Sequence, residues 1–115
     1  MTPGAGMAGP HLAAMLAVVP LFLGTTATAR DTHRTHMVVI ERMKFGAMPA
    51  GLRVGDTLLW VNRDMFRHTA TARDKSFNVD LMAGKSGTIV LKRPGTVAFY
   101  CTFHPGMQGL LSIAR

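Results

Sequence analysis

Short runs of β-branched and aromatic residues alternate with turn signals from Met37 to the end of the chain. Gly55-Asp56 and Pro94-Gly95 are two of these signals, and in the second the proline presets the first turn position while the glycine supplies the positive φ of a type II turn. No stretch in this region has a helical period. The pattern therefore predicts an all-β sandwich. We expect strands at residues 37–43, 52–54, 57–61, 68–72, 77–79, 87–91, 97–101 and 110–113.

Strand parity gives the expected orientation of the only cysteine of the chain, Cys101. Alternate residues of a strand point to opposite faces. Val97 and Phe99 therefore share a face with Cys101, and Ala98 and Tyr100 share the other face. The apolar partners indicate the core side, so we expect the Cys101 thiol to lie at a strand end and to point inward.

The beginning of the chain has a different composition from the rest. Residues 12–24 are almost all apolar, and no Lys, Arg, Asp or Glu precedes Arg30. Ala27-Thr28-Ala29 fits the cleavage pattern of a secretory signal peptide. A membrane-spanning helix or a core helix is the alternative, but the run is shorter than the about 20 residues that a bilayer requires, and Pro20 would break a core helix. We predict a signal peptide at residues 1–29, and the pattern is compatible with a leader that is cut or one kept as an anchor.

The remaining residues, 30–115, form one predicted domain that carries every charged side chain. Thirteen Lys and Arg against six Asp and Glu give a net charge of +7. An exported protein with scattered basic residues is not expected to bind nucleic acid. The charge favours either a solvated surface or electrostatic attraction of an acidic protein partner.

The segment from Cys101 to Met107 places three metal-binding side chain types close together. Cys101, His104 and Met107 have the spacing Cys-x2-His-x2-Met, and His68 begins an earlier predicted strand. Two imidazoles, a thiolate and a weak axial thioether form the ligand set of blue copper sites. A zinc site normally contains more Cys or His and no Met. These residues predict one type 1 copper site.

The predicted domain resembles the cupredoxins, in particular their plastocyanin and amicyanin branch. The residues that carry this resemblance, in chain order, are Gly55-Asp56-Thr57, Trp60-Val61-Asn62, Asp64, His68-Thr69, Pro94-Gly95-Thr96, Tyr100-Cys101-Thr102 and His104-Pro105-x-Met107-x-Gly109. The short loop that ends in Met107 is similar to the amicyanin form. The resemblance implies an eight-stranded Greek-key sandwich with copper at one end.

The resemblance also implies roles for individual residues. The copper ligands would be His68, Cys101, His104 and Met107. Asn62 would tie the first ligand segment to the ligand loop through Thr102, in the manner of outer-shell hydrogen bonds that hold ligands in place. His104 would reach the surface as the electron port. The residues expected to surround it as a docking surface are Met65, Phe66, Phe103 and Pro105, with ordinary core packing as the alternative for these apolar side chains.

These observations predict an exported one-electron carrier, located in the periplasm or otherwise outside the cytoplasm. The alternative is a periplasmic copper carrier or buffer that passes no electrons. An enzyme is not expected, because copper enzymes of this kind need further histidine-rich centres and only His33 and His36 remain in the domain. The expected partners are redox proteins such as a c-type cytochrome or a dehydrogenase with an acidic docking face. We expect a monomer with no stable membrane insertion after cleavage.

Overall fold

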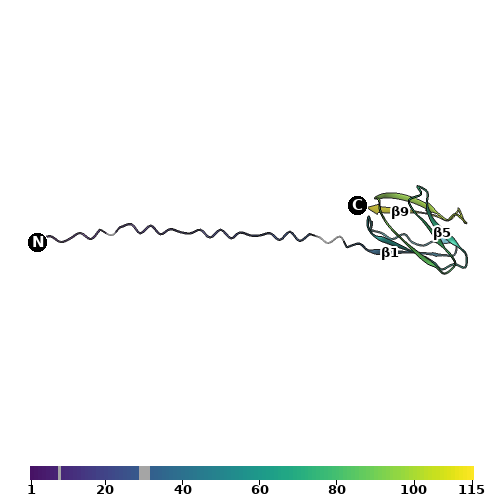
Figure 1. The fold of residues 1–115 in the computed structure, drawn as a ribbon, viewed down its shortest axis with the longest axis horizontal. Coiled ribbons are helices and arrows are strands. Elements are labelled where there is room, and N and C mark those ends of the chain that lie inside the picture. Colours follow the sequence, from purple (N-terminus) through teal and green to yellow (C-terminus); the bar gives the residue numbers. More distant parts are fainter. Residues whose placement is uncertain (8, 29–31) are drawn as a thin grey trace.

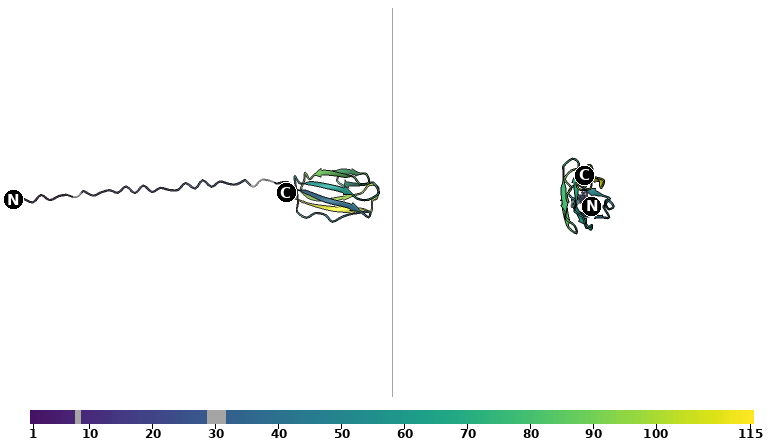
Figure 2. Two further views of the ribbon diagram at one scale, coloured as in Figure 1. Left: turned by 90° about the horizontal axis from the view of Figure 1, so that it is seen from below. Right: turned by 90° about the vertical axis from the view of Figure 1, so that its right-hand side faces the viewer.

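The computed structural model describes residues 1–7, 9–28 and 32–115 and shows two packed β-sheets preceded by an extended segment (Figures 1 and 2). The described strands are β1 (Thr35–Glu41), β2 (Lys44–Phe45), β3 (Leu52–Arg53), β4 (Thr57–Asn62), β5 (His68–Ala72), β6 (Asn78–Leu81), β7 (Ser86–Val90), β8 (Gly95–Tyr100) and β9 (Gln108–Ala114). The first sheet has the order β2-β1-β4-β7, and the second has the order β3-β9-β8-β5-β6. The predicted all-β sandwich is confirmed.

The strand count of the described residues differs from the expected eight because the chain turns back at the end of β1. Residues 37–43 were expected to form one strand, but Arg42 and Met43 have φ values of 52° and 61°. Two successive residues with positive φ make a tight hairpin turn. The turn pairs the two-residue strand β2 with β1 in antiparallel fashion.

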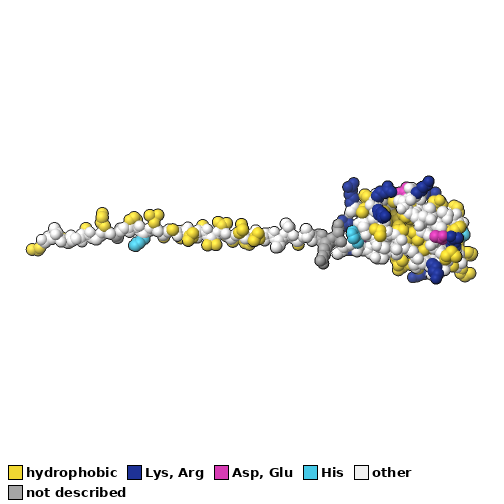
Figure 3. Space-filling view, viewed as in Figure 1, with side chains coloured by type: hydrophobic (Ala, Val, Ile, Leu, Met, Phe, Trp, Pro, Cys, Tyr) yellow, Lys and Arg dark blue, Asp and Glu magenta, His cyan; other side chains and the backbone are white. Residues whose placement is uncertain are grey.

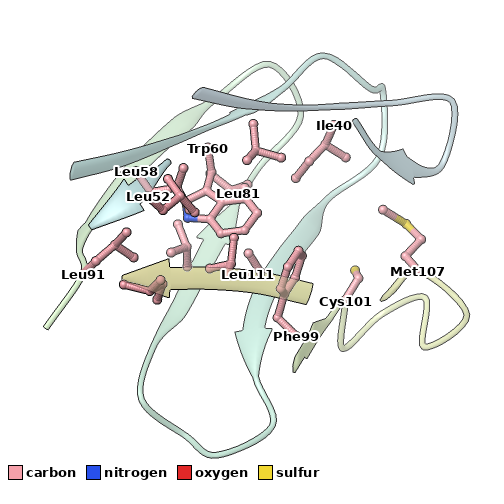
Figure 4. Close-up of a cluster of buried hydrophobic side chains, with 14 residues drawn as sticks. Ile40, Leu52, Leu58, Trp60, Leu81, Leu91, Phe99, Cys101, Met107 and Leu111 are labelled. Atoms are coloured by element: carbon pink, nitrogen blue, oxygen red, sulfur yellow. The ribbon is translucent and has the colours of Figure 1, made fainter. Parts of the chain in front are cut away.

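One face of each sheet supplies the core. In the first sheet β1 and β4 run parallel, and Val38 pairs with Trp60. Both are fully buried. The Trp60 ring meets Phe99 of the second sheet edge-on, with 5.1 Å between ring centroids. Such edge-to-face aromatic pairs stabilise a core beyond the area they bury. Figure 4 shows these apolar side chains filling the space between the sheets.

Strand pairing brings the predicted ligands to one end of the sandwich. β5 and β8 are antiparallel, with Thr71 opposite Tyr100. The start of β5 therefore lies beside the end of β8, which places His68 near Cys101. β8 and β9 are also antiparallel, with Tyr100 opposite Gln108. The segment between them is consequently a loop at that same end, which we call the ligand loop (residues 101–107).

Most of the predicted leader is exposed. Residues 1–7 and 9–28 contain no strand or helix and extend away from the sandwich (Figure 1). None of the described residues belongs to a helix that is long and apolar enough to cross a membrane. The predicted cleavage point after Ala29 lies outside the described residues.

Candidate metal centre

Cys101 and His68 form the buried centre of the candidate site. Both side chains are fully buried, and the Cys101 Sγ lies 3.7 Å from the His68 Nδ1. The backbone N–H of Thr69 donates a hydrogen bond of 3.3 Å to the same sulfur. This donor stabilises negative charge on the sulfur, and a thiolate is the form in which cysteine binds a metal. The predicted inward orientation of Cys101 is confirmed.

The ligand loop is folded back on itself by its own backbone. The Cys101 N–H donates to the Met107 carbonyl at 3.1 Å, and the Met107 N–H donates to the His104 carbonyl at 2.8 Å. The sulfur atoms of Cys101 and Met107 lie toward one another at one end of the core (Figure 4). The His104 ring meets the His68 ring edge-on at 5.1 Å. All four predicted ligands are therefore gathered at one end of the sandwich.

The donor types at this end fit copper. Among the described residues, no three His, Cys, Asp or Glu side chains are close enough to hold a metal by themselves. His68, Cys101 and His104 therefore lie at the same end without all three being at ligand distance from one point, although the rings of the two histidines are in contact. Met107 adds a thioether at this end. A soft thiolate and thioether beside two imidazoles suit copper in both of its common oxidation states. The residues present thus agree with the predicted metal.

Asp64 holds the His68 ring from the side away from the sulfur. Its Oδ2 lies 2.8 Å from the His68 Nε2, which leaves Nδ1 facing Cys101. The same carboxylate accepts the backbone N–H groups of Arg42 at 2.7 Å and Met43 at 2.9 Å. Burial would raise the pKa of Asp64, but the hydrogen bonds from Met43, His68 and Arg42 outweigh it and lower that pKa. Asp64 thereby joins the β1–β2 turn to a predicted ligand.

The structure corrects the expected contact between Asn62 and Thr102. Asn62 is buried. Its amide nitrogen donates to the Phe66 carbonyl, just before β5, at 2.7 Å and to the Leu81 carbonyl, at the end of β6, at 3.0 Å. Its oxygen accepts the Asp64 N–H at 2.9 Å. These bonds use both N–H groups and the oxygen of the amide, and they organise the segment before His68. The ligand loop is instead held by Thr69, whose hydroxyl oxygen accepts the Thr102 N–H at 2.9 Å.

The residues expected to surround His104 lie at the surface. The side chains of Met65, Phe66 and Phe103 are 86%, 55% and 48% exposed, and Pro105 is exposed as well. The alternative of core packing is therefore wrong for these four residues, which we call the apolar rim. His104 is half-buried beside Phe66, with ring centroids 6.3 Å apart.

Arg67 shapes one side of the apolar rim. Its guanidinium lies 4.7 Å from the ring centroid of Phe103 and forms a two-pronged ion pair with Asp80. The hydrogen bond with Asp80 is the main cause that raises the pKa of Arg67. Because the cation lies over the Phe103 ring and is paired with Asp80, this side of the rim carries little net charge.

Two residues of the site were not assigned a role from the sequence. Asp64 and Thr69 both belong to the segments that carry the family resemblance, but their contacts depend on how distant segments meet. Asp64 lies four residues before His68, and a carboxylate near a histidine ligand is a common orienting partner. That spacing was the signal available for Asp64. The role of Thr69 follows only from the register between β5 and β8.

Comparison with known proteins gives consistent results. Amicyanin from Paracoccus denitrificans is 32% identical over 88 residues, which cover 64% of this chain and 60% of that protein. Amicyanin from Paracoccus versutus is 28% identical over 79 residues, with the same two coverages. The chain thus spans about 60% of the length of these curated relatives. No protein-family model matches the chain.

Solved structures of amicyanin share the fold. A reduced variant superposes with a TM-score of 0.59 at 22% identity and covers 69% of this chain and 81% of that chain. A Cu(I) form of another variant at pH 4 has a TM-score of 0.58 at 25% identity, covering 67% and 79%. The two-sheet fold, with sulfur and imidazole groups at one end, is the cupredoxin-like fold of these amicyanin structures. The chain is also similar in sequence to the two Paracoccus amicyanins.

Proposed function

We propose that this chain is a type 1 copper protein that carries single electrons between redox partners. The proposed ligands are His68, Cys101, His104 and Met107. The observation that carries the proposal is the buried contact of 3.7 Å between the Cys101 Sγ and the His68 Nδ1, with the ligand loop folded over it. The names of the amicyanin relatives and the Cu(I) form among the solved structures support it. The cofactor is one copper ion per chain.

The protein's own groups prepare this site. When bound, copper supplies a one-electron change between Cu(II) and Cu(I). His68 and Cys101 are fully buried, so the core around them excludes water. Asp64 fixes the ring of His68, and the Thr69 N–H fixes the sulfur. Donors held this firmly favour a site that rearranges little between oxidation states.

The surface around His104 is the proposed route for electrons. His104 is half-buried, whereas the apolar rim is exposed. Among the described residues, four cations at this end have no ion pair. They are Arg42, Lys44, Arg63 and Lys85. We propose that an apolar patch bordered by cations docks an acidic redox protein, such as a c-type cytochrome or a dehydrogenase.

The proposal includes export of the domain. Residues 1–29 would act as the signal peptide and residues 30–115 as the exported copper domain, in the periplasm or an equivalent compartment. The apolar run and the Ala-x-Ala pattern support this division. The domain is proposed to work as a monomer that takes no part in covalent chemistry on a substrate.

An electron carrier and a copper carrier differ in what they release on reduction and reoxidation: the first gives up only an electron, and the second gives up the copper ion. A carrier of electrons keeps its metal through repeated cycles of reduction by ascorbate and oxidation by ferricyanide. A copper buffer instead releases Cu(I) to a chelator such as bicinchoninate during the reduced phase. We expect full recovery of the oxidised optical spectrum after many cycles, with no copper in the chelator. Stoichiometric loss of copper in the first reduction would support the buffer and contradict the electron carrier.

A further inference from the structure

A row of hydroxyl groups crosses the outer face of the second sheet and ends at the ligand loop. The Thr102 Oγ1 lies 3.2 Å from the Thr69 Oγ1, which lies 2.9 Å from the Thr71 Oγ1. The Thr71 hydroxyl donates to the Asn78 Oδ1 at 2.7 Å. We call these four residues the hydroxyl chain. It extends from the residue next to Cys101 to an exposed side chain on β6.

Secondary structure explains how these side chains meet. Thr69 and Thr71 are two positions apart on β5 and therefore point to the same face. Asn78 is directly opposite Thr71 on the antiparallel strand β6. Thr102 follows β8, on the other side of β5. The hydroxyl chain thus runs from β6 across β5 to the segment that follows β8.

The hydroxyl hydrogens of the hydroxyl chain all point in one direction, from Thr102 toward Asn78. An amide oxygen can only accept, so the Thr71 hydroxyl hydrogen points to Asn78. The Thr71 oxygen then accepts from Thr69, and the Thr69 oxygen accepts from both the Thr102 hydroxyl and the Thr102 N–H. Aligned donors of this kind polarise one another, so each bond strengthens its neighbours. Thr71 and Asn78 therefore affect the strength of the hydrogen bonds that Thr69 accepts from Thr102.

We propose that Thr71 and Asn78 are positioning residues for the ligand loop, acting on it through Thr69. This inference rests on the proposed function where it concerns copper. Thr69 is in a position to transmit the effect because it is buried and contacts the loop twice, through its hydroxyl to Thr102 and through its N–H to the Cys101 sulfur. Among the described residues, neither Thr71 nor Asn78 forms a hydrogen bond to the side chain of a proposed copper ligand.

The first test measures the loop in the metal-free protein. Thr71→Val keeps the shape of the side chain and removes its hydroxyl, whereas Thr71→Ser keeps the hydroxyl. Thr88→Val makes the same change on an exposed position of β7, in the other sheet. The readout is amide hydrogen exchange of Thr102 relative to Phe99, which reports local opening at the loop. We expect exchange to be about threefold to tenfold faster in Thr71→Val, the scale of one weakened hydrogen bond.

Asn78→Ala is expected to act in the same direction as Thr71→Val, and Thr71→Ser and Thr88→Val are expected to match the parent. An unchanged Thr102 exchange rate in both Thr71→Val and Asn78→Ala would overturn the inference. So would an equal increase in Thr88→Val, because the effect would then be general. This measurement needs no metal, so it remains decisive if the protein proves not to bind copper.

The second test measures the copper-loaded protein by its optical and electron paramagnetic resonance spectra. We expect Thr71→Val to shift the sulfur-to-copper absorption band and the copper hyperfine splitting, with parental values in Thr71→Ser. Spectra of Thr71→Val that are identical to the parent would also contradict a positioning role. Absence of a blue band in the parent would reject the proposed function instead, and the exchange result would then decide the inference alone.

Discussion

A single carboxylate, Asp64, connects a strained turn to the candidate metal centre. It accepts N–H groups from Arg42 and Met43, the two residues with positive φ, and it contacts the His68 ring. Non-glycine residues rarely adopt such φ values unless surrounding contacts hold them. One side chain therefore stabilises an unfavourable backbone and orients a proposed ligand at the same time.

Removing this carboxylate is predicted to weaken copper binding. Asp64→Asn retains the size of the side chain but cannot accept on both oxygens, so the His68 ring loses its fixed orientation. We expect copper affinity to fall by about 10- to 100-fold, the usual effect of losing an outer-shell partner. Competition with a chelator measures this value. Asp80→Asn is the matched control, because Asp80 is an ion-paired carboxylate that contacts Arg67 and no proposed ligand. Equal affinities in the two variants would contradict the role of Asp64.

Another carboxylate, that of Asp56, is buried and organises the opposite end of the sandwich. It accepts the N–H of Arg34 at 2.9 Å and of Arg53 at 3.0 Å, and its Oδ2 lies 2.8 Å from the His36 Nε2. The hydrogen bond from Arg34 is the largest cause that lowers the pKa of Asp56 from 3.8 to about 2, followed by the bond from His36. Asp56 thus joins the start of β1 to the turn between β3 and β4.

This low pKa predicts a specific response to acid. A carboxyl group whose pKa is lower in the folded state stabilises the fold above its unfolded pKa, and this stabilisation is lost as the pH falls through the folded value. We therefore expect the metal-free protein to lose stability between about pH 4 and pH 2. Asp56→Asn should show a smaller loss in that window, as measured by denaturant unfolding at each pH. Glu41→Gln, at an exposed position of β1, should follow the parent. A parental pH profile in Asp56→Asn would contradict this assignment.

At the scale of secondary structure, the pairing of β8 and β9 fixes both ends of the ligand loop. Phe99 lies opposite Gly109 across these strands. A side chain at Gly109 would overlap the Phe99 ring, which packs against Trp60 and Phe45. Glycine therefore allows β9 to approach the aromatic core and pair with β8 without displacing the Phe99 ring.

Gly109→Ala is predicted to destabilise the protein by about 1–3 kcal/mol, the typical cost of overpacking a core. The Phe99 ring would have to move against Trp60 and Phe45 to make room. Chemical denaturation of the metal-free protein measures the change in unfolding free energy. The control is Gly106→Ala, where an added Cβ meets no atom within 4 Å. If both substitutions had the same small effect, the close approach of β9 to Phe99 would not limit stability.

The sequence was a good guide to elements whose signal is local. Alternating residues and turn dipeptides located β4 and β7 to within one residue, and β5 was expected at its observed bounds. The turn at Arg42 and Met43 was missed because neither residue is a glycine, and the turn depends on the distant Asp64. Likewise, the motif from Cys101 to Met107 is local and easily identified. Thr102 donates its N–H to Thr69 instead of bonding to Asn62 as expected. Strand register decides which polar groups meet, and short motifs do not specify it.

At the scale of the whole molecule, basic residues outnumber acidic residues by thirteen to six. Figure 3 shows Lys and Arg at both ends of the sandwich, with few acidic side chains on that face. Of the acidic residues described, Asp56 and Asp64 are occupied by hydrogen bonds and Asp80 is paired with Arg67. Such a distribution attracts an acidic partner from a distance and is screened by salt.

Reversing one charge at each end of the molecule tests whether an acidic partner docks at the ligand-loop end or is attracted by the net charge alone. Lys85 lies beside Asn62 at the proposed docking end, because its carbonyl accepts the Asn62 N–H. Lys92 follows β7 at the other end. At low salt we expect Lys85→Glu to slow electron transfer with an acidic c-type cytochrome by roughly threefold or more, and Lys92→Glu to have little effect. Stopped-flow kinetics at several salt concentrations test this. Equal slowing by both substitutions would show that net charge alone controls the encounter.

The central claim is that Cys101 binds copper as a thiolate together with His68. It is tested most directly by the optical spectrum of the purified protein loaded with one equivalent of Cu(II), compared with that of Cys101→Ala. We predict an intense visible thiolate-to-copper band in the parent, bleached reversibly by ascorbate, and no such band in the variant. Pale absorption in the parent, or Cu(II) binding that is unchanged in Cys101→Ala, would contradict the assignment of this centre.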